Sequence, residues 1–215
     1  MAKIPMGILG ALIGTLGPVT GKKWLDENTL SSRRKQAKTD TDPTPNQDNQ
    51  RTKFGFVSHF HGGSSDFVKL TFKEVGGKRT AFQRAISYNA NNAVSGTKPD
   101  FKIHYDRVAV GRGALPNAVL PEAKTGDTPG DIHYTWADNT GIGTAAANDI
   151  AIAVAYCPAY DQWIWCKPGT ATRADGSVSF SVPAFSGKTV HTWLTFATVE
   201  GKSSDSIYTG ELQVK

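Results

Sequence analysis

The sequence of 215 residues has only two cysteines, Cys157 and Cys166. Two cysteines are too few for a disulfide-rich scaffold or for a multi-cysteine zinc site, which needs four ligands in close array. The uncharged segment 4–19 is shorter than the roughly 20 residues that span a bilayer, and glycines interrupt it. A single lysine precedes this segment and no small-residue cleavage site follows it, so we expect no membrane span and no secretory signal, and the location stays open.

Catalytic and metal-binding signatures are also missing. No nucleophile elbow, phosphate loop or pair of neighbouring carboxylates occurs, and the glycine pairs at 111–113 and 141–143 are typical of turns. His59 and His61 lie two residues apart, so on a helix they point in different directions. We therefore expect neither an enzyme nor a bound metal, cofactor or small-molecule substrate.

The composition is that of a folded, loop-rich protein, with 39% hydrophobic residues, 20% charged residues and 22 glycines. The net charge of +5 is unevenly distributed. Residues 1–112 carry 18 basic and 9 acidic side chains, and residues 113–215 carry 6 and 10. Opposite charge on the two parts favours head-to-tail contact between copies; alternatively, the parts are two solvated surfaces that differ by chance. The basic part also allows nucleic-acid binding, although no motif of a nucleic-acid fold occurs.

The N-terminal segment is rich in glycine, at positions 7, 10, 14, 17 and 21. Each glycine costs a helix about 1 kcal/mol relative to alanine, so a water-exposed helix is excluded. The segment is expected to gain order by docking, either on its own domain or on a neighbouring copy. Residues 19–24 then form either a hairpin or part of an extended arm.

A capping box predicts that a helix begins at Thr44, because Gln47 stands at the position that reaches back to the cap. Phe54, Val57 and His61 are spaced for one face of this helix, and glycines at 62 and 63 end it.

The same capping spacing recurs at Thr80 and Gln83. It predicts a second helix with Phe82, Ile86 and Ala90 on one face, ending before Gly96. Residues 64–75 mix helix and strand periods, and we favour a helix there.

From residue 101 the pattern changes to short alternating runs broken by glycine, proline and Asp-Asn. The expected strands are 101–105, 107–112, 131–137, 149–157, 162–167, 177–182, 189–199 and 206–214. The seven from 107 onward predict an immunoglobulin-like β-sandwich. The fold class is therefore mainly β with a smaller α part: a glycine-rich arm and basic linker (1–43), a short helical region (44–100) and the sandwich (101–215).

One hairpin can be analysed residue by residue. A turn at Asp161 and Gln162 places Cys157 directly opposite Cys166, within the distance that a disulfide tolerates. The alternative is two free thiols on the same face of the sheet.

The same hairpin divides its side chains by size. The face that carries Trp163 and Trp165 is large and apolar, which indicates the core. Ala151, Ala153 and Ala155 form the other face, which is flat and small. That face is either ordinary exposed alanine or a surface for a close-packed neighbour.

Several blocks of the sequence carry a family resemblance: Thr44-Pro45, residues 50–54, residues 81–89, residues 92–96 and residues 99–101, with residues 7–10 at the start and residues 190–191 and 208–211 near the end. In these blocks the chain resembles a family of uncharacterised proteins of about this length from Bacteroidota. The resemblance implies no activity and no catalytic residues.

Together these patterns predict a structural subunit that assembles with copies of itself into a filament, sheath or shell through its arm and its charge-complementary surfaces. The alternative is a binding module whose sandwich loops hold a carbohydrate or protein ligand. The predicted assembly interface consists of Ile8, Leu9, Leu12, Ile13, Leu16, Val19, Trp24, Arg33, Arg34, Ala151, Ala153 and Ala155.

Overall fold

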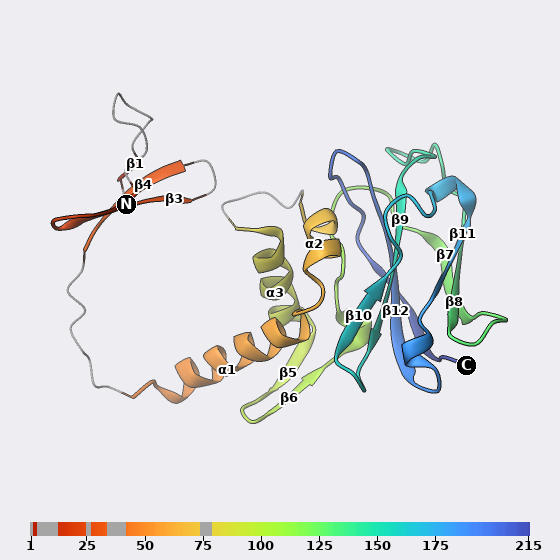
Figure 1. The fold of residues 1–215 in the computed structure, drawn as a ribbon, viewed down its shortest axis with the longest axis horizontal. Coiled ribbons are helices and arrows are strands. Elements are labelled where there is room, and N and C mark those ends of the chain that lie inside the picture. The colour runs from red at the N-terminus through yellow and green to blue at the C-terminus, as the bar shows by residue number, and fades with distance from the viewer. Residues whose placement is uncertain (1, 4–12, 25–26, 34–41, 74–78) are drawn as a thin grey trace. The chain divides into compact units, whose positions relative to one another are not determined.

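A computed structural model describes residues 2–3, 13–24, 27–33, 42–73 and 79–215 of the chain (Figure 1). The chain divides into two compact units, Met1–Pro43 and Thr44–Lys215.

The first unit contains an antiparallel sheet with the strand order β1-β4-β3-β2. Its strands are β1 (Ala2–Lys3), β2 (Gly14–Leu16), β3 (Val19–Trp24) and β4 (Glu27–Ser32). Gly17 has a φ of 56° in the turn before Pro18, a conformation that glycine adopts without strain. Trp24 is paired with Glu27, so β3 and β4 form a hairpin. Of the two arrangements expected for residues 19–24, the hairpin is the one observed.

Capping residues set the beginning of two helices in the second unit. In α1 (Pro45–Phe60), the Gln47 amide donates to Thr44 Oγ1 at 3.3 Å, and the Thr44 amide donates to Gln47 Oε1 at 3.2 Å. Thr80 and Gln83 repeat this reciprocal pair at the start of α3 (Ala81–Asn92). A short helix, α2 (Ser65–Thr71), lies between them. Both capping-box predictions are confirmed, and residues 64–75 are helical in part.

The face predicted for the first helix is correct only in its C-terminal part. Val57 and His61 are buried, but Phe54 is 54% exposed. The reason is that the packed face of α1 runs through Phe56 and Phe60, which belong to hydrophobic clusters, and Phe54 lies off that face. The predicted face of α3 is confirmed, since Ile86 packs with Phe82 and Ala90.

Two antiparallel sheets form the sandwich, with strand orders β10-β9-β12-β13 and β11-β8-β7. The strands are β7 (Val119–Thr125), β8 (Asp131–Ala137), β9 (Ile150–Cys157), β10 (Gln162–Trp165), β11 (Ser177–Ser181), β12 (Thr189–Ala197) and β13 (Ile207–Gln213). The prediction of a mainly β fold with a sandwich and short helices is confirmed.

Two of the predicted strands differ from the structure: one is absent, and the other pairs outside the sandwich. Residues 107–112 form no strand, because a 3₁₀ turn (Tyr105–Arg107) and a stretch of non-repetitive chain occupy this region. The first expected strand is β6 (Asp100–Ile103), which pairs only with β5 (Val94–Thr97), in a separate two-stranded sheet.

Strand β7 was missed. Leu120 has a φ of 48°, and the register with β8 shifts between Val119 and Glu122. This irregularity breaks the alternation by which strands are predicted.

The sheet that contains β9 is buried on both faces. In Figure 1, α1–α3 lie on one side of it, and the sheet of β7, β8 and β11 lies on the other. Ile152, Val154 and Trp163 belong to the hydrophobic cluster with the helices. The alanines of β9 belong to the cluster between the two sheets. The second unit therefore has three layers with a central sheet.

Within the described residues, no helix has both the length and the apolar character that crossing a membrane requires.

Candidate functional site

The predicted assembly residues of the N-terminal unit are only partly visible. Ile8, Leu9, Leu12 and Arg34 lie outside the described residues, as does the side chain of Trp24, which ends β3. Among the others, Ile13 is 72% exposed and Leu16 is 68% exposed. Val19 is half-buried and Arg33 is exposed.

Strand register divides the N-terminal sheet into two chemically different faces. Leu16 pairs with Val19, and Gly21 pairs with both Gly14 and Leu30. Directly opposed residues lie on the same face of a sheet, so these five residues share one face. The register also places Lys23, Asn28 and Ser32 on this face, so it is apolar at Leu16, Val19 and Leu30, flat at the glycines and polar at these three positions.

The opposite face is polar. Thr15 and Thr20 are paired, and their hydroxyl oxygens lie 3.5 Å apart. Thr29 Oγ1 donates to the Lys22 carbonyl at 3.1 Å, and Ser31 Oγ donates to the Thr20 carbonyl at 3.4 Å. The hydroxyls thus form hydrogen bonds with one another and with the backbone.

Within the first unit, the apolar face is exposed at Gly14 and Leu16 and half-buried at Val19 and Leu30. Of the residues in the first unit whose burial is described, only Gly21 is buried. A small sheet gains stability in water when its hydrophobic residues pack against another element. The face defined by Gly14, Leu16, Val19, Gly21 and Leu30 is called here the uncovered apolar face, after its exposed part at Gly14 and Leu16.

The alanine part of the predicted interface is wrong. Ala151, Ala153 and Ala155 are all 0% exposed, inside the cluster between the two sheets. The large residues on the other face of β9 are covered by helices, so both faces of this strand are internal. The alanines are small because the second sheet packs over them, and no neighbouring copy can reach them.

The predicted pairing of the cysteines is also wrong. Cys157 is paired with Gln162, because the chain turns over residues 158–161 and not at 161–162. Both thiols are free and buried. Cys166 Sγ lies 3.1 Å from the Ala153 amide, which donates to it, and burial raises the pKa of the Cys166 thiol.

The two neighbouring histidines lie in different environments. His59 Nδ1 is 3.0 Å from Asp161 Oδ2, and its side chain is 81% exposed. His61 is fully buried, with Nδ1 2.9 Å from Ser64 Oγ and Nε2 2.8 Å from Asn89 Nδ2. Burial lowers the pKa of His61 to about 4. The buried ring links α1 to α3 and takes no part in a surface site.

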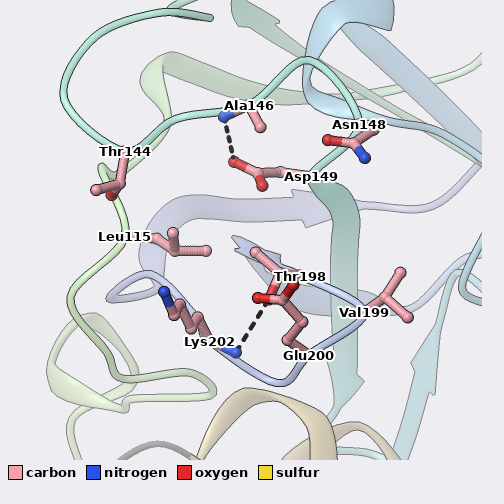
Figure 2. A pocket seen from close by; sticks show the side chains of 9 residues that line it. All are labelled: Leu115, Thr144, Ala146, Asn148, Asp149, Thr198, Val199, Glu200 and Lys202. Carbon is pink, nitrogen blue, oxygen red and sulfur yellow. Dashed lines mark hydrogen bonds between the residues drawn. The ribbon is translucent and has the colours of Figure 1, made fainter.

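The loops at one end of the sandwich enclose a pocket of about 260 Å³ (Figure 2). Its walls come from the segment that precedes β7, from the β8–β9 loop and from the β12–β13 loop. They consist of Leu115, Thr144, Ala146, Asn148, Asp149, Thr198, Val199, Glu200 and Lys202. We call this cavity the loop-end pocket.

One wall of the loop-end pocket is a rigidly held carboxylate. Asp149 Oδ2 accepts hydrogen bonds from Arg173 Nε at 2.9 Å and from the Ala146 amide at 3.0 Å. Asp149 and Arg173 are 1% and 0% exposed in this ion pair. Figure 2 shows the Asp149 carboxylate among the residues that line the pocket. Its orientation is fixed by these bonds, so it forms a rigid part of the pocket wall.

Arg173 in turn ties three loops together. Its Nη1 donates to Asn139 Oδ1 at 2.6 Å, and its Nη2 donates to the Pro116 carbonyl at 3.0 Å. The guanidinium carbon also lies 3.9 Å from the centre of the Phe196 ring. A buried guanidinium needs all of these partners, because each unpaired donor carries a desolvation cost.

Sequence reasoning missed this network. Arg173 and Asp149 are 24 residues apart, and no local spacing relates them. The one local signal is Thr172, whose amide and hydroxyl both donate to Asp175 Oδ2 and so fix the turn that carries Arg173.

The sequence model of a family of unknown function, DUF6266, matches residues 11–210. This agrees with the expected membership of an uncharacterised family, and the expected bacterial source stays a prediction. No curated protein matches the chain. Among solved structures, the fn3 domain of human collagen alpha-1(XX) chain is similar, at 18% identity and a TM-score of 0.31, over 49% of this chain and 85% of that one.

Proposed function

The chain belongs to the DUF6266 family, and from this premise we propose that it is a non-enzymatic structural subunit that assembles with copies of itself. The observation that carries the proposal is the uncovered apolar face of the N-terminal sheet. The occupant of that face is a second copy of the chain.

The chemistry of the uncovered apolar face favours a protein partner. Leu16, Val19 and Leu30 each contribute on the order of 1–2 kcal/mol when their exposed surface is covered. Gly14 is exposed and presents no side chain, so another backbone can approach closely at its position. The hydroxyls of the polar face behind these residues already form hydrogen bonds, and this favours packing on the apolar side.

Charge favours a copy of the same chain as that partner. Residues 1–112 are basic in balance and residues 113–215 are acidic. A contact between the N-terminal sheet of one copy and the acidic part of the next joins unlike surfaces. Such a contact is heterologous, so it repeats into a filament, sheath or shell unless rotation closes a ring.

The test uses two adjacent residues on opposite faces of β2. Leu16→Asp places a charge in the uncovered apolar face, and Thr15→Asp places the same charge on the polar face. Light scattering and negative-stain electron microscopy of the full chain should show assemblies that Leu16→Asp disperses and Thr15→Asp leaves intact.

Both variants change the net charge equally, so a difference in assembly between them shows which face of the sheet makes the contact and is not an effect of electrostatic repulsion. The outcome that contradicts the proposal is a monodisperse monomer of the unmodified chain at all concentrations. Equal dispersal by both variants also contradicts it, because it assigns the contact to charge alone.

A second function is favoured by the loop-end pocket, where a buried arginine holds the Asp149 carboxylate in place. In this second function the protein is a binding module, and its ligand is a hydroxyl-bearing molecule of the size of a monosaccharide, held by the carboxylate of Glu200 against the rigid wall that Asp149 and Arg173 support. Titration with a panel of neutral monosaccharides should give saturable shifts of the Ala146 amide resonance. Glu200→Gln should weaken them and leave the Arg173 network in place. Absence of saturation with every sugar rejects this function and leaves the assembly proposal unaffected.

A further inference from the structure

A second cavity, of about 480 Å³, lies on the helical side of the second unit. It is built by three segments that are distant in sequence: α3, the chain at 106–112, and the β12–β13 connection. Its lining is Tyr88, Asn92, Asp106, Arg107, Val108, Ala109, Gly111, Arg112, Asp205 and Ser206. Two arginines in one pocket distinguish it from the loop-end pocket, and we call it the arginine pocket.

The backbone around Arg112 is fixed by its glycine neighbours. A Cβ at Gly111 would lie 2.7 Å from Thr195 Oγ1, and a Cβ at Gly113 would overlap the backbone oxygen of Ser203. Only glycine therefore allows this chain to lie flush against β12 and the connection that follows it. The Gly-Arg-Gly sequence is more than a turn, because it holds one arginine on a close-packed strip of backbone.

Hydrogen bonds complete the anchoring of Arg112. Its amide donates to the Thr71 carbonyl at 2.9 Å, and its carbonyl accepts from Ser203 Oγ at 2.7 Å. The guanidinium carbon lies 4.2 Å from the centre of the Tyr88 ring on α3. A planar cation stacked on an aromatic ring is oriented by it, and its N–H groups stay in the plane of the guanidinium.

The contacts of both guanidinium groups with carboxylates are loose. Arg112 Nε lies 3.7 Å from Asp205 Oδ1, and Arg107 Nε lies 3.8 Å from Asp106 Oδ2. Both distances exceed a hydrogen bond. Asp205 Oδ1 already accepts from the Gly113 amide at 3.2 Å. Among the residues that the structure describes, neither side chain donates a hydrogen bond, so the terminal nitrogens of both remain available.

We propose that the arginine pocket binds a small oxyanion, a carboxylate or a phosphate group, between Arg107 and Arg112. The forked terminal nitrogens of arginine match two oxygens of such a group, which is why arginine is preferred for bidentate recognition. Ser206 and Asn92 line the same cavity and supply a hydroxyl and an amide beside the anion.

The charge balance of the pocket sets the strength of binding. Asp106 and Asp205 offset the two arginines, so the empty pocket is close to neutral. An incoming anion competes with Asp205 for Arg112. Removing that competitor with Asp205→Asn should increase the affinity for the anion. If the ligand were bound by shape alone, this substitution would leave the affinity unchanged.

The experiment is a titration of the full chain with inorganic phosphate and, separately, with acetate, followed by the amide resonances of Gly111, Arg112 and Gly113. Sodium chloride at matched ionic strength controls for screening. Saturable shifts with phosphate or acetate, and none with chloride, are expected. The anion that binds more tightly identifies the class of ligand.

Three variants decide whether the arginine fork is responsible. Arg112→Lys keeps the charge and loses the fork, and it should weaken binding about tenfold or more, which corresponds to one charge-assisted hydrogen bond. Arg51→Gln removes an exposed positive charge on α1 and should leave binding unchanged. Asp205→Asn should strengthen it. Thermal unfolding of each variant shows that the fold is retained.

Lack of saturation with both anions overturns the proposal. Equal weakening by Arg112→Lys and Arg51→Gln also overturns it, because it reduces the effect to net charge. The proposal is independent of self-assembly, since neither Leu16 nor the rest of the uncovered apolar face contributes to the arginine pocket.

Discussion

Protonation of His61 should destabilise the second unit in mild acid. The ring is fully buried between α1, α3 and the Trp163 side chain, on which it stacks at 5.9 Å. The side-chain amide of Asn89 also donates to the Ala109 carbonyl, so its nitrogen is a donor. His61 Nε2 must then accept, and Nδ1 donates to Ser64 Oγ. A second ring proton would point at an N–H group, in a site without a charged partner among the described contacts.

The magnitude follows from the pKa of His61, which falls from 6.5 in the unfolded chain to about 4 in the folded protein. One pKa unit is equivalent to about 1.4 kcal/mol, so the difference corresponds to about 3 kcal/mol of folding free energy. Between pH 4 and 6.5 the unfolded chain binds one more proton at this position than the folded chain does. The contribution of His61 to the free energy of unfolding is therefore fully present above pH 6.5 and is lost as the pH falls toward 4.

Urea unfolding of the full chain at several pH values between 7 and 4 measures this loss, and His61→Gln supplies the reference without a titrating ring. His191 contributes with the same sign, because burial lowers its pKa against the opposing effect of Glu211. Subtracting the His61→Gln curve removes that contribution and those of the carboxylates. The free energy of unfolding should fall about 3 kcal/mol further in the unmodified chain. Parallel curves for the two proteins would refute the reasoning.

Two further predictions concern the second unit. Arg173→Met leaves the Asp149 carboxylate buried without its partner and should lower the free energy of unfolding, measured in urea, by about 3–5 kcal/mol. Adding Asp149→Leu to this variant should restore a large part of the lost stability. Equal stability of the single and the double variant would show that the ion pair does not matter. Cys157 and Cys166 should react with a thiol reagent only after unfolding, and two thiols per chain should then be counted under non-reducing conditions. A mass lower by two hydrogen atoms would instead reveal a disulfide, which the observed register does not allow.

The helix starts were predictable because their causes are local. Thr44 and Thr80 each form a capping box within four residues, so sequence spacing contains the whole interaction. The same argument explains the miss at β7. Leu120 adopts a left-handed conformation that the neighbouring residues do not predict. The strand with which this irregular segment pairs, β8, is distant in the sequence from those neighbours.

In the β9–β10 hairpin, the faces of the side chains were predicted correctly although the position of the turn was not. The true turn spans residues 158–161, where Asp161 has a φ of 50°. The predicted pairing is therefore displaced by an even number of residues. Side chains alternate with a period of two, so every residue stays on its predicted face while every partner changes. The prediction of shared faces is correct, and the opposition of Cys157 and Cys166 is not.

The candidate sites were less predictable than the fold. The arginine pocket and the loop-end pocket join segments that are 14 to more than 100 residues apart, and only the folded backbone brings them together. The alanine face failed for a related reason. Alternation reveals that β9 has a small face, but it does not reveal that a second sheet covers that face.

The burial of β9 on both faces has a consequence for cooperativity. Its even-numbered side chains belong to the helical layer, and its odd-numbered ones belong to the layer between the sheets. Neither layer can be removed without exposing half of the same strand. Residues 44–215 should consequently lose their structure in one transition, and a fragment without the helices should be unable to fold as an independent sandwich. Because β9 belongs to both layers, a substitution that destabilises the packing of one layer should also destabilise the other.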